Sequence, residues 1–145
     1  MTKISFNFFQ QEIHSKHYID QLEKQVVELV NIERVNHGLQ PLTVNLNLVE
    51  IARIKSEDMY KNNYFSHDSP TLGCSFDMLK MSGIQYSHAA ENIAKGQKNA
   101  LIVVNSWLNS TGHMKNILGK EYTETGVGLA DIRGTPIWTQ VFIRP

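Results

Sequence analysis

Two histidines and one glutamate, far apart in the chain, have side chains that could do chemistry in a single cleft. His67 stands in the turn-forming run Ser66-His67-Asp68, Glu91 precedes Asn92, and His113 follows a glycine. An imidazole can bind a metal or exchange a proton near neutral pH. Two histidines and a glutamate are also a ligand set that zinc accepts, with a fourth position left for water or substrate. The sequence lacks a short-spaced His-Glu-x-x-His motif, so only the fold can bring the three together.

Each of these residues also has an ordinary structural interpretation. His67 could brace a loop, and His113 could cap or pack a helix. Glu91 lies among alanines, where a carboxylate is costly to bury unless a cation, a metal or backbone N–H groups pair with it. Gln140 could reach the same cleft or hydrogen-bond within a sheet, and Cys74 is predicted to be a small core or loop residue.

A serine nucleophile is the rival chemistry. Four serines lie near a candidate histidine in the sequence: Ser66, Ser69, Ser106 and Ser110. No Gly-x-Ser-x-Gly motif, which places a nucleophilic serine on a sharp turn, accompanies them. Serines are common in loops, so the sequence favours the histidines and the glutamate as the site.

The composition excludes some functions. Acidic and basic residues both total 14, so the formal net charge is zero and no basic excess indicates nucleic acid or an anionic membrane as a partner. No run approaches the roughly 20 apolar residues of a membrane span. The N-terminal residues lack the continuous apolar region of a signal peptide. A length of 145 residues predicts one domain.

Helical patterns come first in the chain and strand patterns come last. We expect residues 1–19 to be a tail, irregular over 1–17, that docks on a domain spanning 20–145. The further elements predicted are helices from residue 19 to about 37, from 45–47 to about 62, over 76–81 and from 99 to a break at Gly112, a turn of helix to 118, and strands over 89–95, 125–131 and 137–143. This order predicts an α+β fold with an antiparallel sheet covered by helices.

The sequence resembles the CAP superfamily, also called the SCP-like or sperm-coating-protein domain, and is most similar to its bacterial branch. The matching pieces occur in family order over about 20–145 and include Asn31-Ile32-Glu33-Arg34, Phe65-Ser66-His67, Glu91-Asn92-Ile93-Ala94, Trp107-x-x-Ser110-x-Gly112-His113-x-x-Asn116, Gly126-Val127-Gly128 and Trp138-Thr139-Gln140. The resemblance implies an α-β-α sandwich with a small central antiparallel sheet between helical layers and a large open cleft.

The resemblance also implies a site. Animal and plant relatives line the cleft with two histidines and two glutamates that can hold zinc or another divalent metal. His67 and Glu91 match two of these positions, whereas Ser110 and Ile137 replace the other two. The bacterial branch has a Gly-His pair, here Gly112-His113, so His113 could supply the missing ligand. The cleft residues expected on this basis are His67, Glu91, Ser110, His113 and Gln140.

Three functions are compatible with this family resemblance. The favoured one is a non-catalytic, secreted or cell-wall-associated module that binds a small ligand, a metal, a wall component or a protein. The alternatives are a zinc-dependent hydrolase of the peptidase kind and a lipid or sterol carrier. The incomplete ligand set favours binding over catalysis. An extracellular location follows from the resemblance alone.

Overall fold

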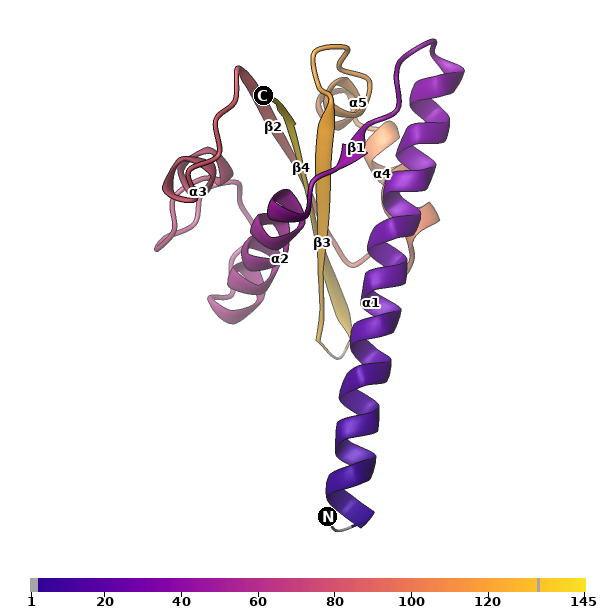
Figure 1. Cartoon of the computed structure of the whole chain (residues 1–145), viewed down its shortest axis with the longest axis vertical. Coiled ribbons are helices and arrows are strands. Elements are labelled where there is room, and N and C mark those ends of the chain that lie inside the picture. The colour runs from indigo at the N-terminus through magenta and orange to yellow at the C-terminus, as the bar shows by residue number, and fades with distance from the viewer. Residues whose placement is uncertain (1–2, 133) are drawn as a thin grey trace.

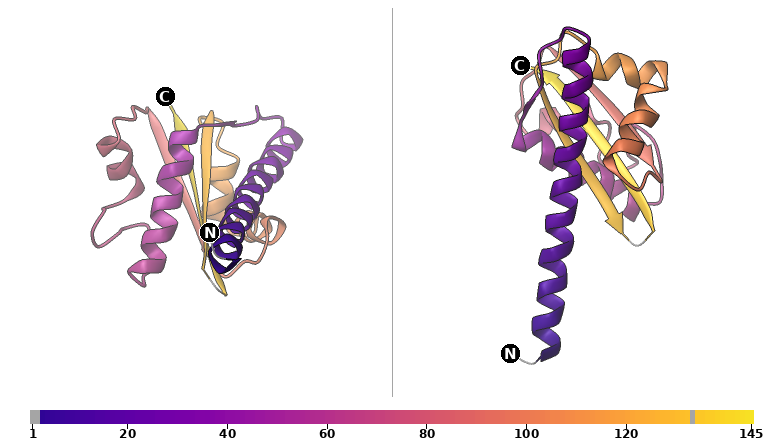
Figure 2. Two further views of the ribbon diagram at one scale, coloured as in Figure 1. Left: turned by 60° about the horizontal axis from the view of Figure 1, so that its bottom comes forward. Right: turned by 90° about the vertical axis from the view of Figure 1, so that its right-hand side faces the viewer.

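The chain folds into three layers, with a sheet between two layers of helices (Figures 1 and 2). A computed structural model describes residues 3–132 and 134–145, with side chains left out of the description for 3–17 and 132. In those ranges the elements are α1 (Lys3–Asn36), β1 (Thr43–Val44), α2 (Leu46–Lys61), α3 (Ser75–Met81), β2 (His88–Lys95), α4 (Ala100–Leu108), α5 (Thr111–Ile117), β3 (Glu124–Ile132) and β4 (Thr135–Arg144). Helices α2 and α3 cover one face, and α1, α4 and α5 cover the other. The predicted α+β class and α-β-α sandwich are therefore confirmed.

The sheet is mixed rather than purely antiparallel. Its strand order within the described residues is β1-β3-β4-β2. Strand β4 runs antiparallel to both β2 and β3, as predicted, with Asn92 opposite Gln140 and Val127 opposite Gln140 on the other side. The short strand β1 pairs in parallel with the start of β3. Two residues are too few to give a period-2 pattern, so the sequence did not indicate β1.

Several helix ends lie where the sequence predicted them. The Asn45 side chain accepts a hydrogen bond from the backbone of Asn47 and begins α2. The Asn99 side chain accepts one from Ile102 and begins α4. Gly38, with φ of 73°, follows the end of α1 in the left-handed conformation that glycine adopts without strain. The two asparagines and the glycine therefore mark the starts of α2 and α4 and the end of α1.

Two local predictions were wrong. The segment predicted to be irregular is helical from Lys3, and Figure 1 shows this end of α1 projecting away from the sheet. No glycine or proline interrupts residues 3–37, so the helix continues unbroken. Gly112 does not break α4, which ends at Leu108, and it lies inside the first turn of α5. Residues 1–2 lie outside the described range, and the boundary between 19 and 20 stays a prediction.

Apolar side chains fill both interfaces of the sheet. Trp107, Trp138 and Phe142 are fully buried in the cluster against α1 and α4. Leu48 and Val141 belong to a second cluster beneath α2 and α3. Both tryptophans are thus core residues. Each indole N–H also donates to a backbone carbonyl, so neither is buried without a partner.

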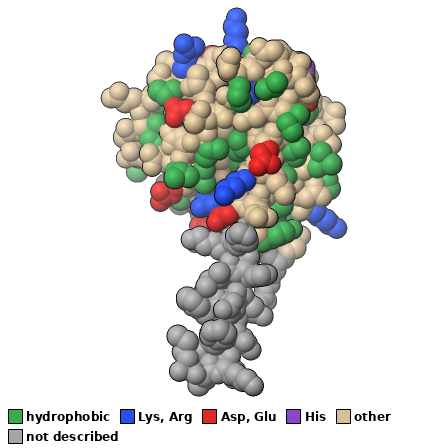
Figure 3. Space-filling model, turned by 45° about the vertical axis from the view of Figure 1, so that its right-hand side comes forward, with side chains coloured by type: hydrophobic (Ala, Val, Ile, Leu, Met, Phe, Trp, Pro, Cys, Tyr) green, Lys and Arg blue, Asp and Glu red, His purple; other side chains and the backbone are tan. Residues whose placement is uncertain are grey.

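Helix α2 lies directly on β3, and this close approach sets the position of the cleft. A Cβ added at Gly126 or Gly128 would come within 2.3 Å of the α2 backbone, so only glycine fits there. The guanidinium of Arg53 on α2 also bonds the buried carboxylate of Glu23 on α1. Figure 3 shows acidic and basic side chains meeting on this side of the molecule, just above the grey segment. Both contacts hold α2 fixed relative to the sheet.

Candidate functional site around His67

Strand β2 directs its side chains to opposite faces of the sheet and thereby builds both walls of the site. Ala90 and Ala94 belong to the cluster against α1 and α4, whereas Ile93 packs with Met59 of α2. By the two-residue period of a strand, Glu91 points to the α2 face and Asn92 to the α4 and α5 face. The consecutive Glu91 and Asn92 therefore contact two different parts of the chain.

Glu91 binds His67 directly. The Nδ1 of His67 donates to Oε1 of Glu91 at 2.6 Å. The carboxylate is almost fully buried, with 4% of its side chain exposed, whereas the imidazole is 57% exposed. The hydrogen bond to Glu91 raises the pKa of His67 above its ordinary value, although burial works against it. The carboxylate therefore orients the ring, favours its charged form and leaves Nε2 as the remaining ring nitrogen.

Helix α2 holds the loop that carries His67 through a buried lysine. The Nζ of Lys55 donates to the backbone carbonyl of His67 at 2.7 Å and lies 5.3 Å from the ring centre of Tyr64. Lys55 is fully buried. Burial lowers its pKa, while the negative charge of Glu91 acts in the opposite direction. This ammonium thus fixes the backbone of His67 and partly balances the charge of Glu91.

Asp58, one turn further along α2, holds the two ends of the same loop. Its carboxylate accepts hydrogen bonds from the hydroxyl of Tyr64, from Oγ of Ser69 at 2.6 Å and from Nδ2 of Asn62 at 2.6 Å. Burial and the bond to Asp58 raise the pKa of Tyr64 to about 12. Three donors from one short loop therefore converge on one acceptor, which makes the loop compact and places His67 at its centre.

The opposite wall of the site comes from α5, which is tied to β2 by two asparagines. Asn92 Nδ2 donates to the carbonyl of His113 at 3.1 Å. Asn116 Nδ2 donates to Oδ1 of Asn92 at 2.8 Å and to the carbonyl of Glu91 at 3.2 Å. Burial lowers the pKa of His113, and the charge of nearby His67 lowers it further. The two histidines are therefore close enough for the charge of one to act on the other, and their pKa values shift in opposite directions.

The end of α5 is fixed from α1 by Arg34. Its guanidinium donates to the carbonyls of Ile117 and Gly119, each at 2.8 Å, and its Nε donates to the carbonyl of Gln40. Helix C-termini leave carbonyls without partners inside the helix, and a buried cation satisfies them well. Arg34 is 1% exposed and thus anchors α5 from inside the molecule.

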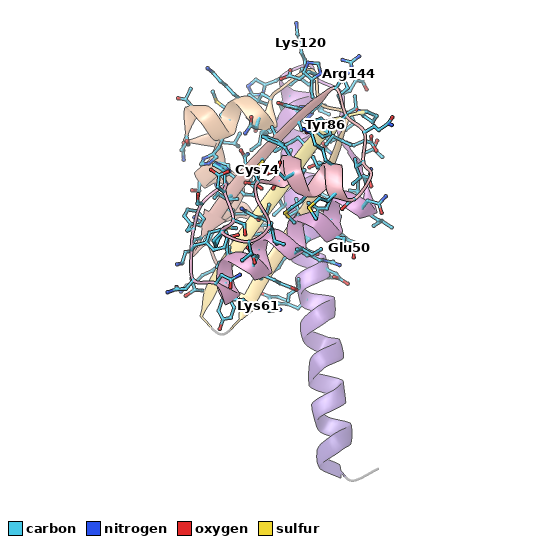
Figure 4. All side chains as sticks on the ribbon, turned by 90° about the vertical axis from the view of Figure 1, so that its left-hand side faces the viewer. Glu50, Lys61, Cys74, Tyr86, Lys120 and Arg144 are labelled. Carbon is cyan, nitrogen blue, oxygen red and sulfur yellow. The ribbon has the colours of Figure 1, made fainter. Side chains whose placement is uncertain are left out.

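His67 lines two cavities, one on each side of it. The first has a volume of about 430 Å³, and its lining includes Ser75, Phe76, Glu91 and Asn116. The second has about 450 Å³ and is lined by Phe65, Gln97, Ser106 and His113, among others. Figure 4 views the molecule from this side, with Cys74 labelled at the start of α3. Cys74 also lines the first cavity; of the core and loop positions predicted for it, the structure shows the loop, at the residue that precedes α3.

The predicted site residues divide into two groups. His67, Glu91 and His113 come together around the cavities. Ser110 instead forms the N-terminal cap position of α5 and lines neither cavity. Gln140 is fully buried in the sheet, where its Nε2 donates to Oγ1 of Thr125 at 3.1 Å. Of the two roles left open for Gln140, the structure shows the one within the sheet.

The donor set for a metal is incomplete around His67. Among the described side chains, no three His, Cys, Asp or Glu residues lie close enough together to hold a metal ion. Glu91 directs Oε1 at the Nδ1 of His67, the position of a carboxylate that orients a ligand rather than serves as one. Only the imidazoles of His67 and His113 then remain as donors on the second cavity. This arrangement does not fit the three protein ligands of a catalytic zinc.

Sequence reasoning missed the residues that hold the site together. Lys55 follows Ile51 and precedes Met59 by four residues each, so it lies on the buried face of α2. A charged residue on the buried face of a helix indicates that a hydrogen-bonding or oppositely charged group of another segment lies next to it. Asn92 and Asn116 stood in the matched motifs, but a single sequence does not reveal that they bond each other across two elements.

Comparison with known proteins agrees with the fold. The family model described as "Cysteine-rich secretory protein family", or CAP, matches residues 27–142. The chain therefore belongs to the CAP family. It is 54% identical to the Bacillus subtilis protein YkwD over 121 residues, which are 83% of this chain and 46% of YkwD.

Solved structures show the same fold. An extracellular protein of Bacillus anthracis that contains an SCP domain superposes with a TM-score of 0.85 at 39% identity, over 90% of this chain and 42% of that one. An outer surface protein of Borrelia burgdorferi has a TM-score of 0.78 at 18% identity, over 83% of this chain and 90% of that one, and shares the fold. The chain thus spans less than half the length of YkwD and of the B. anthracis protein. No helix in the described residues is long and apolar enough to cross a membrane.

Proposed function

We propose that this domain is an extracellular binding module whose cleft around His67, Glu91 and His113 takes a component of the cell wall. The observation that carries the proposal is the pairing of an exposed imidazole with a buried carboxylate at the junction of two cavities. A rigid, oriented polar group in a concave site is what small-ligand recognition requires. The extracellular location is supported by the related SCP protein of B. anthracis, which is described as extracellular.

Binding is favoured over catalysis because the polar groups of the site are mostly engaged in holding the structure. Lys55 and Asp58 are bonded to the loop, and Asn92 and Asn116 are bonded to each other and to the backbone. Ser110 and Ile137 stand where metal-binding relatives carry further ligands, according to the resemblance. The site therefore has one oriented His–Glu pair and a second histidine, without a complete set for hydrolysis.

The proposal is tested by pelleting the domain with insoluble cell-wall sacculi from Bacillus subtilis. We expect the wild-type protein to sediment with the sacculi, and we expect His67→Ala and Glu91→Gln to reduce the pelleted fraction severalfold. His37→Ala is the matched control, because His37 is an exposed histidine at the end of α1. Equal pelleting of all four proteins would contradict the proposal, as would a peptidase activity that His67→Ala abolishes.

The zinc-dependent hydrolase remains as an alternative that a metal titration decides. Two imidazoles would hold zinc weakly, so we expect calorimetry on chelator-stripped protein to show no stoichiometric binding. Stoichiometric zinc binding that is lost in both His67→Ala and His113→Ala would establish a metal site and favour the hydrolase. The lipid or sterol carrier stays a prediction, and native mass spectrometry of the purified domain tests it.

A further inference from the structure

The two cavities beside His67 lie one after the other along β2 and share that residue, and we call the pair the groove. Ala89 and Glu91 line the first cavity, and Ile93 and Lys95 line the second. At about 3.3 Å per strand residue, the distance from Ala89 to Lys95 is about 20 Å. Since His67 belongs to both linings, a ligand that fills the groove must pass beside its ring. The shape therefore favours a linear chain over a compact molecule.

Buried polar atoms along the groove lack partners within the described part of the chain. In the first cavity these are Oε2 of Glu91 and Oγ of Ser75, whose residues are 7% and 2% exposed. In the second cavity it is Oε1 of Gln97. Buried polar atoms are almost always satisfied by the protein, by water or by a ligand, so each of these needs a donor from water or from a ligand. All three accept hydrogen bonds, which indicates a ligand rich in O–H or N–H groups on both sides of His67.

One exposed aromatic ring lies in each half of the groove. Phe76 lines the first cavity and is 39% exposed, whereas Phe65 lines the second and is 47% exposed. Large apolar rings left open to water beside polar groups offer flat surfaces for stacking. A ligand that combines apolar faces with many hydrogen-bond donors would use both features at once.

An added peptide strand fits the groove less well, although β2 is an edge strand of the described sheet. Strand addition requires free backbone carbonyls along the edge. The carbonyl of Glu91 already accepts from Asn116, and the carbonyl of Ile93 accepts from the indole of Trp107. The central carbonyls of the β2 edge therefore already have side-chain partners, and covering an edge strand in this way is a common means of preventing strand pairing.

We propose that the groove binds a linear oligosaccharide of two or more rings, with rings on both sides of His67. Hydroxyl and acetamido groups would donate to Glu91, Ser75 and Gln97, and the apolar ring faces would stack on Phe65 and Phe76. This inference rests on the proposed function, because it names the chemical class of the cell-wall component that the cleft takes.

The test is a calorimetric comparison of β-1,4-linked N-acetylglucosamine oligomers with one, two and four rings. We expect the tetramer to bind at least about tenfold more tightly than the monomer, because a single ring cannot reach both halves. Phe65→Ala and Phe76→Ala should each weaken tetramer binding by about tenfold or more, equivalent to about 1.4 kcal/mol. Tyr18→Ala is the matched control, since Tyr18 is an exposed aromatic residue on α1 away from the groove.

Three results would overturn the inference. They are the absence of binding at millimolar oligomer, equal affinity for monomer and tetramer, and tetramer binding unchanged in both phenylalanine variants. Binding of an extended alanine-rich hexapeptide, lost in the same variants and without any glycan binding, would assign the groove to peptides instead. If sacculi still pellet the domain in a His67-dependent way, only the glycan assignment fails; if that pelleting is also absent, the proposed function fails with it.

Discussion

The two faces of the sheet are covered by helices in chemically different ways. On the face of α1 and α4, buried apolar side chains form one large cluster around Trp107 and Trp138, and a few buried polar groups such as Glu23 and Arg34 accompany it. On the face of α2, apolar contacts alternate with buried polar groups, among them Lys55, Ser56 and Glu91. Apolar packing does not depend on the direction in which the side chains meet, whereas a buried polar group must meet its hydrogen-bond partner with defined geometry.

We infer from this difference that one face mainly stabilises the fold, whereas the other mainly determines the position of His67. The apolar face carries the larger cluster of buried side chains, so we expect it to contribute more of the free energy that holds the layers together. The polar face fixes the loop from Asn62 to Ser69 through Lys55 and Asp58, and so determines where His67 stands. We therefore expect substitutions on the apolar face to lower the free energy of unfolding strongly. Substitutions on the polar face should change the properties of His67 more than they change stability.

The largest effect is expected from Trp107→Ala. Trp107 is fully buried, and its indole N–H donates to the carbonyl of Ile93 at 3.1 Å. Truncating a large buried aromatic residue lowers the free energy of unfolding by about 3–5 kcal/mol. Urea unfolding followed by circular dichroism measures the loss. Leu101→Ala on the same helix is the control, because Leu101 is 57% exposed and should cost little. Similar losses for both variants would remove the distinction between core and surface on this face.

Arg34→Met would sharpen the comparison, because it removes a polar anchor from the apolar face. The carbonyls of Ile117 and Gly119 would lose a charged donor. Hydrogen bonds to charged groups contribute about 1.5–3 kcal/mol each, but the cost of burying the guanidinium, which lowers the pKa of Arg34, offsets part of that gain. We expect a loss of about 2–3 kcal/mol in urea unfolding, together with NMR shift changes at His113 on α5. Arg144→Met, at an exposed position near the C-terminus, should have no such effect. A stable variant with an unchanged His113 signal would show that α5 does not depend on Arg34.

Sequence reasoning succeeded where the physical signal is local. Asn45, Asn99 and Gly38 predicted helix ends because a cap or a left-handed residue acts on its own neighbours. It failed where the signal is tertiary. Nothing near Lys55 in the sequence indicates the carbonyl of His67 as its partner, and β1 exists only because β3 lies beside it. His67, Glu91 and His113 were candidates from their residue types, but only the family resemblance placed them in one cleft, because their separation in the chain hides their contact.

Lys55→Met tests the polar face directly. The methionine fills a similar volume but leaves the carbonyl of His67 without its donor, so we expect a loss of about 1–2 kcal/mol in urea unfolding. The positive charge of Lys55 also lowers the pKa of His67. Its removal should therefore raise that pKa, which proton NMR titration of the imidazole measures. Lys61→Met, an exposed lysine at the end of α2, is the control. A fall in the pKa of His67, or no change in it, would contradict the proposed arrangement.

Glu91→Gln gives the smallest expected effect on stability and the clearest one on His67. The hydrogen bond from His67 to Glu91 raises the pKa of the imidazole, so the pKa should fall in the variant. Because the folded pKa lies above the unfolded value of about 6.5, the pair stabilises the wild type fully below about pH 6.5. That contribution is lost as the pH rises through the folded pKa.

The half-exposed ring limits this contribution to less than about 1 kcal/mol. Urea unfolding of the wild type at pH 5.5 and pH 8 should show the difference, and Glu91→Gln should flatten it. Glu50→Gln, at an exposed position on α2, should leave both the pH dependence and the NMR titration of His67 unchanged. An unshifted pKa of His67 in Glu91→Gln would mean that the polar face places the ring without controlling its charge. The polar face would then differ from the apolar face only in fixing the position of His67, and not in setting its pKa.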